Sequence, residues 1–337
     1  MKTDAELLTL DDAEALIRDA LLAIGVPVDS AASVALALVS AEAEGQVGHG
    51  FSRLADYAAQ VRSGKIVADA RPAVEMVSET SVLVDAGNGF AFPALDAALD
   101  RGCDLADRIG TATMLVTRSH HCGALSIQVE RIASRGLIGL MVANSPPAIA
   151  PWGSNEPVFG TNPIAFAVPR GDLPPLVIDL SMSRVARGKI MHARKTGASI
   201  PEGWALDRNG RPTTDPEAAL AGSMVPIGEA KGTALALMVE ILAATLTAAN
   251  PSTRVSSFFT ADGPPPGTGQ FLMALKPHDM DGFGQRLEAL LGHIAGLDGA
   301  RLPGTRRAAA ISKARSSGIV VPLDYVEAAR ALAASNG

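Results

Sequence analysis

Apolar residues recur at three- and four-residue steps in three successive segments of the first 65 residues, which predicts three helices. Thr9, with Asp12 three positions later, is the predicted cap of the first helix, and Asp29 or Ser30 is that of the second. The third helix carries an apolar stripe that includes Tyr57. The predicted stops of the three helices are Gly25, Gly45 and Gly64.

Beyond residue 75, apolar runs of strand length alternate with helical segments, which indicates an α/β fold. Strands are predicted at 81–85, 113–117, 138–143, 163–168, 176–180 and 270–275. Helices are predicted at 94–109, 124–134, 228–249, 283–294 and 324–334. No hydrophobic period lasts between residues 181 and 222, so this section is predicted to be a long functional excursion. Residues 301–307 are predicted to form a basic turn.

Composition excludes several classes of protein. The chain has 337 residues, 47% of them apolar, and a net charge of −6, which argues against a nucleic-acid-binding surface. Its two cysteines form neither a disulfide framework nor a thiolate zinc site, and no metal is expected. The N-terminus lacks an apolar signal core. The apolar stretch 232–249 carries the charged residue Glu240, which favours a buried helix over a membrane-spanning one. A soluble cytoplasmic protein is expected.

His49 and Arg53 are the first candidates for chemistry. His49 lies on a short glycine-flanked loop between two predicted helices, and Arg53 follows four positions later. A histidine donates or accepts a proton near neutral pH, and an arginine binds a carboxylate through two parallel hydrogen bonds. The pair suits the reduction of a small 2-oxo or 2-imino acid. On spacing alone, the alternative of a histidine at a helix junction and a solvated arginine stays open.

Further polar residues stand where strands end or helices begin. His120 and His121 follow a predicted strand and precede a helix, where free backbone N–H groups suit an anionic ligand. Asp179 ends another strand and precedes Ser181, so its carboxylate could hold a ribose hydroxyl or simply cap a helix. Lys231, at the start of a helix, could contact a phosphate. A binding site for a 2′-phosphate could be formed by Arg301, Arg306 and Arg307, although surface arginines commonly contact only solvent.

Two motifs are not supported. Gly87-Asn88-Gly89 follows a strand, but Phe92 stands where the dinucleotide fingerprint needs a third glycine, so a Rossmann fold is not expected. Cys122 has no evident base partner and is a poor candidate for a nucleophile.

Taken together, these segments resemble the malate/L-lactate dehydrogenase family of NAD(P)-dependent oxidoreductases, which is distinct from the Rossmann-fold lactate and malate dehydrogenases. The resemblance is carried by seven ordered stretches, at 49–54, 119–123, 159–165, 185–190, 200–207, 212–216 and 229–232. It extends over nearly the whole chain.

The resemblance implies an α/β fold with a non-Rossmann cofactor-binding sheet, a helical N-terminal arm and a C-terminal helical segment packed with that arm. The implied domains are 1–75 for the arm with the catalytic loop, 76–280 for NAD(P) and substrate, and 281–337 for the returning segment. A homodimer is also implied, with the partner helping to complete the active site.

The resemblance also assigns roles to residues. His49 is implied as the proton donor, Arg53 as the anchor of a small carboxylate substrate, and Thr161 as a neighbour of that substrate. The implied cofactor contacts are His120, His121, Cys122, Gly123, Ala124, Asp179, Ser181, Lys231, Arg301, Arg306 and Arg307. The basic turn at residues 301–307 predicts NADPH as the preferred cofactor, with NADH as the alternative.

The resemblance also bears on which substrate the enzyme reduces. Stretches 159–167, 301–307 and 121–125 are similar to the branch that reduces Δ1-pyrroline-2-carboxylate and Δ1-piperideine-2-carboxylate. Two positions depart from that branch: Gly48 stands where a relay serine commonly precedes the histidine, and Lys189 where an aspartate would support it. Lys189 belongs to the pattern of 2-hydroxy-acid dehydrogenases. On balance the three similar stretches favour a cyclic-imine reductase, with a 2-hydroxy-acid dehydrogenase of the malate, lactate or sulfolactate type as the alternative.

Overall fold

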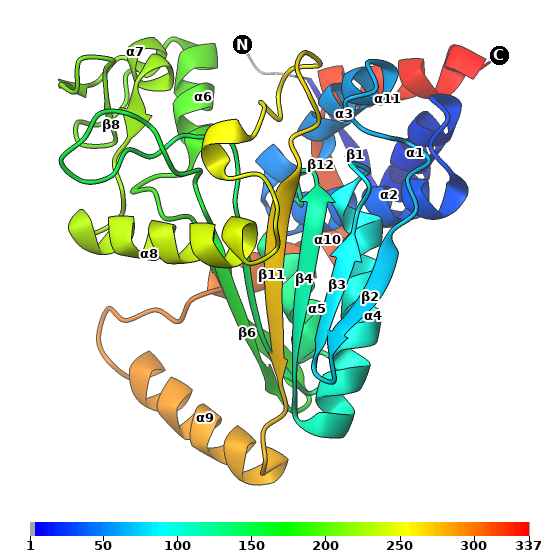
Figure 1. Ribbon diagram of the computed structural model, residues 1–337, viewed down its shortest axis with the longest axis vertical. Helices are drawn as coiled ribbons and strands as arrows, with labels where there is room; N and C mark the ends of the chain where they lie inside the picture. Colours follow the sequence, from blue (N-terminus) through cyan, green and yellow to red (C-terminus); the bar gives the residue numbers. More distant parts are fainter. Residues whose placement is uncertain (1–3, 337) are drawn as a thin grey trace.

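A seven-stranded mixed sheet forms the centre of the computed structural model, which describes residues 4–336 (Figure 1). Its strands run in the order β2-β3-β4-β11-β5-β6-β7. Only β3 and β4 pair in parallel, and every other neighbouring pair is antiparallel. The bounds are β2 Ala73–Ser78, β3 Ser81–Asp85, β4 Thr111–Ser119, β5 Ile138–Ala143, β6 Ile164–Arg170, β7 Leu173–Leu180 and β11 Thr268–Leu275.

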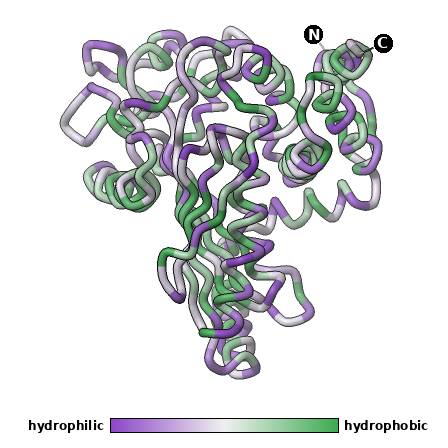
Figure 2. The backbone as a smooth tube through the Cα atoms, turned by 45° about the vertical axis from the view of Figure 1, so that its right-hand side comes forward, coloured by the Kyte–Doolittle hydropathy of each residue, from purple (hydrophilic) through white to green (hydrophobic). Residues whose placement is uncertain are grey.

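Alternate side chains of each strand point to opposite faces of the sheet, and helices cover both faces. Helices α4 (Ala91–Ile109) and α5 (Leu125–Ala133) pack on one face, around residues such as Val84, Met114 and Met141. Helix α8 (Ala230–Glu240) and the π-helical turn Ile241–Thr245 pack on the other. Most of the sheet strands are coloured as hydrophobic in Figure 2.

A helical part stands at one edge of the sheet (Figure 1). It comprises α1 (Leu10–Ala23), α2 (Val28–Ala43), α3 (Leu54–Arg62), α10 (Thr305–Ser317) and α11 (Leu323–Ala333), together with the antiparallel pair β1 (Ala5–Leu8) and β12 (Ile319–Pro322). Residues from both ends of the chain share one hydrophobic core there.

A smaller lobe with its own core is built from the chain between β7 and α8, together with the segment 148–159 that follows β5. It contains α6 (Arg187–Thr196), α7 (Pro216–Ala221) and the three-stranded sheet of β8 (Ala205–Leu206), β9 (Pro212–Thr213) and β10 (Ser223–Met224). Helix α9 (Met280–Ala295) lies at the opposite end of the sheet, where Arg170 of β6 pairs with Glu288 at 2.7 Å.

The predicted α/β fold and its helical arm are confirmed, as is the Thr9 cap, whose side chain accepts the Asp12 N–H at 3.1 Å. The predicted cap of the second helix is wrong. Helix α2 begins at Val28 after Pro27, with no side-chain cap, and Asp29 lies in its first turn, where its charge favours the helix dipole.

The predicted excursion 181–222 contains two helices that were not predicted, α6 and α7. Helix α6 buries only Ile190 and Ala193, so it shows no hydrophobic period. The basic turn ends at Gly304, after which α10 begins. No helix in the described part of the chain has the length and apolar character needed to cross a membrane.

Candidate active site

The loop that carries His49 is built as two short 3-10 turns, Val47–His49 and Phe51–Arg53, between α2 and α3. Gly50 joins the turns and lies against the buried side chain of Glu42, whose Oε2 accepts the Phe51 N–H at 2.9 Å. A Cβ atom at Gly50 would stand 1.8 Å from that oxygen, so a larger residue there would displace the Glu42 carboxyl. Burial raises the pKa of Glu42 to about 7. The carboxyl group of Glu42 thus fixes the loop from beneath.

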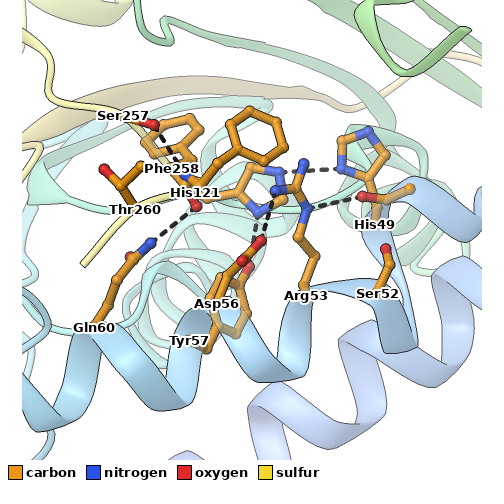
Figure 3. Close-up of polar contacts among 12 residues, drawn as sticks. His49, Ser52, Arg53, Asp56, Tyr57, Gln60, His121, Ser257, Phe258 and Thr260 are labelled. Atoms are coloured by element: carbon orange, nitrogen blue, oxygen red, sulfur yellow. Dashed lines mark hydrogen bonds and ion pairs between the residues drawn. The ribbon is translucent and has the colours of Figure 1, made fainter. Parts of the chain in front are cut away.

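His49 contacts a second histidine. Its Nδ1 lies 3.1 Å from His121 Nε2, and the two rings stack with centroids 5.1 Å apart. On the far side of His121, Nδ1 lies 2.7 Å from the hydroxyl of Tyr57, a fully buried residue of α3 (Figure 3). Burial and the Arg53 charge lower the pKa of His49 to about 4, and burial lowers that of His121 well below its usual value. All three groups are therefore neutral near pH 7.

Arg53 is buried, with its guanidinium 4.2 Å from the centre of the Phe259 ring. Its Nε donates to the carbonyl of Gly48 at 2.8 Å, and its Nη1 lies 3.4 Å from Asp56. The arginine therefore holds the His49 loop through one nitrogen and keeps further donors for a ligand. The structure places the predicted proton donor and the predicted carboxylate anchor on one loop (Figure 3).

The segment 257–262 forms a wall beside these residues. Phe258 packs against the rings of His120 and His121, and Phe259 lies on Arg53. The segment is fixed by the buried Lys65, whose ammonium donates to the carbonyls of residues 257, 260 and 262 at 2.7, 2.9 and 2.8 Å. Gln60 of α3 adds a hydrogen bond to the Phe258 carbonyl at 2.9 Å.

The other predicted cofactor residues after β4 are buried. Neither ring nitrogen of His120 has a hydrogen-bond partner in the described chain, and burial lowers its pKa to about 3. Burial raises the pKa of the Cys122 thiol to about 12, so it stays protonated. Gly123 adopts the left-handed conformation (φ +67°), and Ala124 caps α5. The two free nitrogens of His120 suit a polar group of a bound molecule.

Asp179 and Arg307 are brought together at the start of α5. Asp179 accepts the Ser126 N–H at 2.9 Å, and the Ser126 hydroxyl donates to Glu44 at 2.6 Å. Arg307 pairs with Glu44 at 2.5 Å and also with Glu130. The turn before α10 rests on β7, because Gly304 packs against the Val177 carbonyl. Arg307 is thus held by two carboxylates, while Arg301 and Arg306 are exposed.

The remaining predicted residues lie in other places. Thr161 donates its backbone N–H to the Ser145 hydroxyl at 3.0 Å, and the Ser181 hydroxyl lies 3.0 Å from that of Ser183. Lys231 is exposed at the start of α8. No hydrogen bond or ion pair within the described chain joins these three residues to His49.

Comparison with known proteins decides the family. Residues 8–329 match the family model described as malate/L-lactate dehydrogenase. The chain belongs to the malate/L-lactate dehydrogenase family. It is 48% identical over 332 residues to a (2R)-3-sulfolactate dehydrogenase (NADP(+)) of Chromohalobacter salexigens, covering 98% of this chain and 99% of that one.

Members that act on imines are similar too. A Δ1-pyrroline-2-carboxylate/Δ1-piperideine-2-carboxylate reductase of Pseudomonas syringae pv. tomato is 38% identical over 94% of both chains. A crystal structure of Δ1-piperideine-2-carboxylate reductase from the same organism superposes with a TM-score of 0.92 at 37% identity, covering 97% of this chain and 99% of that one. The predicted family and the NAD(P)-dependent oxidoreductase class are therefore confirmed.

Two residues that surround His49 and Arg53 are not predicted from the sequence. The apolar pattern assigns Tyr57 only to a buried stripe, although Tyr57 lies one helical turn after Arg53, the residue that precedes α3. Glu42 stands among the mainly apolar residues of the second half of α2, and a carboxylate at that place is the signal that points to it.

Proposed function

We propose that this protein is an NADPH-dependent dehydrogenase of a small 2-hydroxy acid, which it interconverts with the 2-oxo acid. The observation that carries the proposal is the juxtaposition of His49 and Arg53 on one loop, with the guanidinium buried and the imidazole backed by His121. Arg53 binds the carboxylate of the substrate, and His49 lies four residues away to exchange a proton with the oxygen on C2.

The residues around His120 fit a nicotinamide cofactor. Both of its ring nitrogens are buried without a partner in the described chain, and the left-handed Gly123 opens the backbone before α5. When bound, the nicotinamide exchanges a hydride with C2. His120 would hold its polar edge, and Asp179 a ribose hydroxyl. Arg301 and Arg306, which are exposed, would meet a 2′-phosphate. Arg307 would contribute indirectly, because its ion pair with Glu44 holds that carboxylate in position.

The substrate class favoured is a 2-hydroxy acid with a second anionic group, as in sulfolactate. The sulfolactate dehydrogenase is more similar to this chain than the imine reductases named above, at 48% against 38% identity. Arg187, at the start of α6, is the residue that we propose for the second anionic group. It is half-buried, its Nη1 lies 3.5 Å from the Pro147 carbonyl, and no carboxylate of the described chain pairs with it. A partly desolvated guanidinium of this kind suits a sulfonate or a second carboxylate.

A cyclic 2-imino carboxylate is the second candidate. The similarity to imine reductases over nearly the whole chain and the stretch 159–167 favour it. The same site would serve, because Arg53 again binds the carboxylate and the proton goes to nitrogen.

Nicotinamide absorbance separates these candidates. We expect NADPH oxidation with sulfopyruvate, slower oxidation with pyruvate and oxaloacetate, and little with pyrroline- or piperideine-2-carboxylate. Turnover of the imines alone would refute the 2-hydroxy-acid proposal. Equal rates with NADH and NADPH, unchanged in Arg306→Ala, would refute the cofactor preference. In Arg187→Met, the KM for sulfopyruvate should rise about 10-fold while that for pyruvate stays within about twofold.

We also propose that the protein is a homodimer, as the family resemblance implies. Helix α8 and the turn after it expose a row of large apolar side chains, among them Leu237 (47%), Ile241 (49%) and Leu246 (52%). A contiguous apolar face of this kind marks an interface. Light scattering after size exclusion should give a dimer for the wild type and a monomer for Leu237→Glu/Ile241→Glu. Leu173→Glu, at an equally exposed hairpin residue, is the matched control.

A further inference from the structure

Three side chains from three segments form a continuous hydrogen-bonded chain into the site. Tyr57 comes from α3, His121 from the turn after β4, and His49 from the loop after α2. The phenol lies 2.7 Å from His121 Nδ1, and His121 Nε2 lies 3.1 Å from His49 Nδ1 (Figure 3). The wall formed by Phe258 packs against His121 and excludes water from its side.

The positions of the hydrogens follow from the partners. Tyr57 is fully buried, and within the described chain its hydroxyl has His121 as its only hydrogen-bond partner. The phenol therefore donates to His121 Nδ1, which leaves the proton of the neutral His121 on Nε2, donating to His49 Nδ1. The proton of His49 then stands on Nε2, which has no partner in the described chain. The reverse order would leave a buried hydroxyl hydrogen without an acceptor, at a cost of about 1–3 kcal/mol.

We infer that Tyr57 is the source of the proton that His49 delivers, and that His121 relays it. This inference rests on the proposed reduction at C2. As hydride from the reduced nicotinamide adds to C2, the π electron pair of the C=O bond moves to oxygen, which takes the Nε2 proton of His49. His49 Nδ1 then takes the Nε2 proton of His121, and His121 Nδ1 takes that of Tyr57. A phenolate remains. After the product leaves, a proton from solvent enters at His49 Nε2, and the transfers run in reverse, from His49 Nδ1 to His121 Nε2 and from His121 Nδ1 to the phenolate, which restores the starting tautomers.

The relay supplies what the loop otherwise lacks. Gly48 has no side chain to hold His49, and Lys189 is an exposed cation in the place of a supporting carboxylate. With His49 and His121 both neutral, a proton must come from another group. A phenol suffices, because the alkoxide formed at C2 is a stronger base than a phenolate.

The charges around Tyr57 agree with a short-lived phenolate. Burial raises the pKa of Tyr57 and the Asp56 carboxylate adds to the rise, while the Arg53 guanidinium, one helical turn away, favours the anion. His120 faces Tyr57 edge-on at 5.9 Å and is neutral. The phenol is therefore the resting form, and the anion exists only while the product is bound.

Tyr57→Phe tests the relay, because it removes one oxygen and keeps the ring that packs edge-on against Phe90 at 5.5 Å. We expect kcat for 2-oxo-acid reduction to fall about 100-fold near neutral pH, with KM within about twofold. Activity should recover as the pH falls toward the pKa of His49, which can then take a proton from solvent. Tyr325→Phe, at the other tyrosine of the chain, should match the wild type.

A second readout needs no turnover. In protein with ¹⁵N-labelled histidine, NMR should show His49 as a single tautomer protonated on Nε2, and as a mixture in Tyr57→Phe. A wild-type His49 protonated on Nδ1, or a Tyr57→Phe variant with wild-type kcat and pH profile, would overturn the inference. If the wild type reduced none of the 2-oxo or 2-imino acids, the proposed function would fail while the tautomer result still decided the hydrogen-bond chain.

Discussion

Replacing Glu42 by glutamine tests how the loop that carries His49 is supported. The Glu42 carboxyl is buried under Gly50, and its pKa rises from an ordinary value of 4.5 to about 7 because burial disfavours its charge. The folded protein therefore binds this proton more tightly than the unfolded chain does. The stabilisation is fully present below pH 4.5 and is lost as the pH rises through about 7. A shift of this size corresponds to about 3 kcal/mol.

Urea unfolding at about pH 5 and about pH 8 measures the effect, because glutamine cannot ionise. The stability of the wild type relative to Glu42→Gln should fall by about 2–3 kcal/mol between these two pH values. Glu327→Gln, at an exposed residue of α11, should show no such change. A difference between wild type and Glu42→Gln that stays constant with pH would refute the assignment of a buried neutral carboxyl.

Three further substitutions test other parts of the site. Lys65→Met leaves three carbonyls of segment 257–262 without their shared donor. It should lower the free energy of unfolding in urea by about 2–4 kcal/mol and speed amide hydrogen exchange in that segment. The control Lys276→Met, at an exposed lysine, should lower the free energy of unfolding by less than about 0.5 kcal/mol. Arg53→Lys should raise the KM for 2-oxo acids about 100-fold, since lysine lacks the planar fork that can donate to Gly48 through Nε and bind a carboxylate through both Nη atoms; an unchanged KM would exclude Arg53 as the anchor. Glu240→Leu should lower Tm, because the carboxylate binds Asn162 and Ser252.

Much of the fold could be predicted from the sequence because its buried elements have a regular period. Strands β3 and β5 are apolar runs, and the stripe of α1 faces one core. Elements with little burial gave no such signal. Every residue of β2 is exposed, and α10 buries only Ala314, so neither was predicted.

The candidate site was predicted less completely, because spacing reports residues on one segment and not contacts between segments. His49 and Arg53 were found since they share a loop. Their partners His121 and Tyr57 meet only in the folded chain, and His121 had been assigned to the cofactor. Lys65 belongs to no motif, and its role appears only when its ammonium meets three carbonyls nearly 200 residues away.

The place of β11 in the sheet has a consequence for how the protein is made. This strand lies between β4 and β5, yet it leaves the ribosome more than 100 residues after both. Until residues 268–275 emerge, β4 and β5 have no strand to join them, and the two halves of the sheet present open edges that invite pairing with other chains. The same strand binds the His120 carbonyl through Thr268 at 3.0 Å. Assembly of the active site therefore waits for a late event in synthesis, and slow translation between residues 143 and 268 would prolong the interval in which the nascent chain is prone to aggregate.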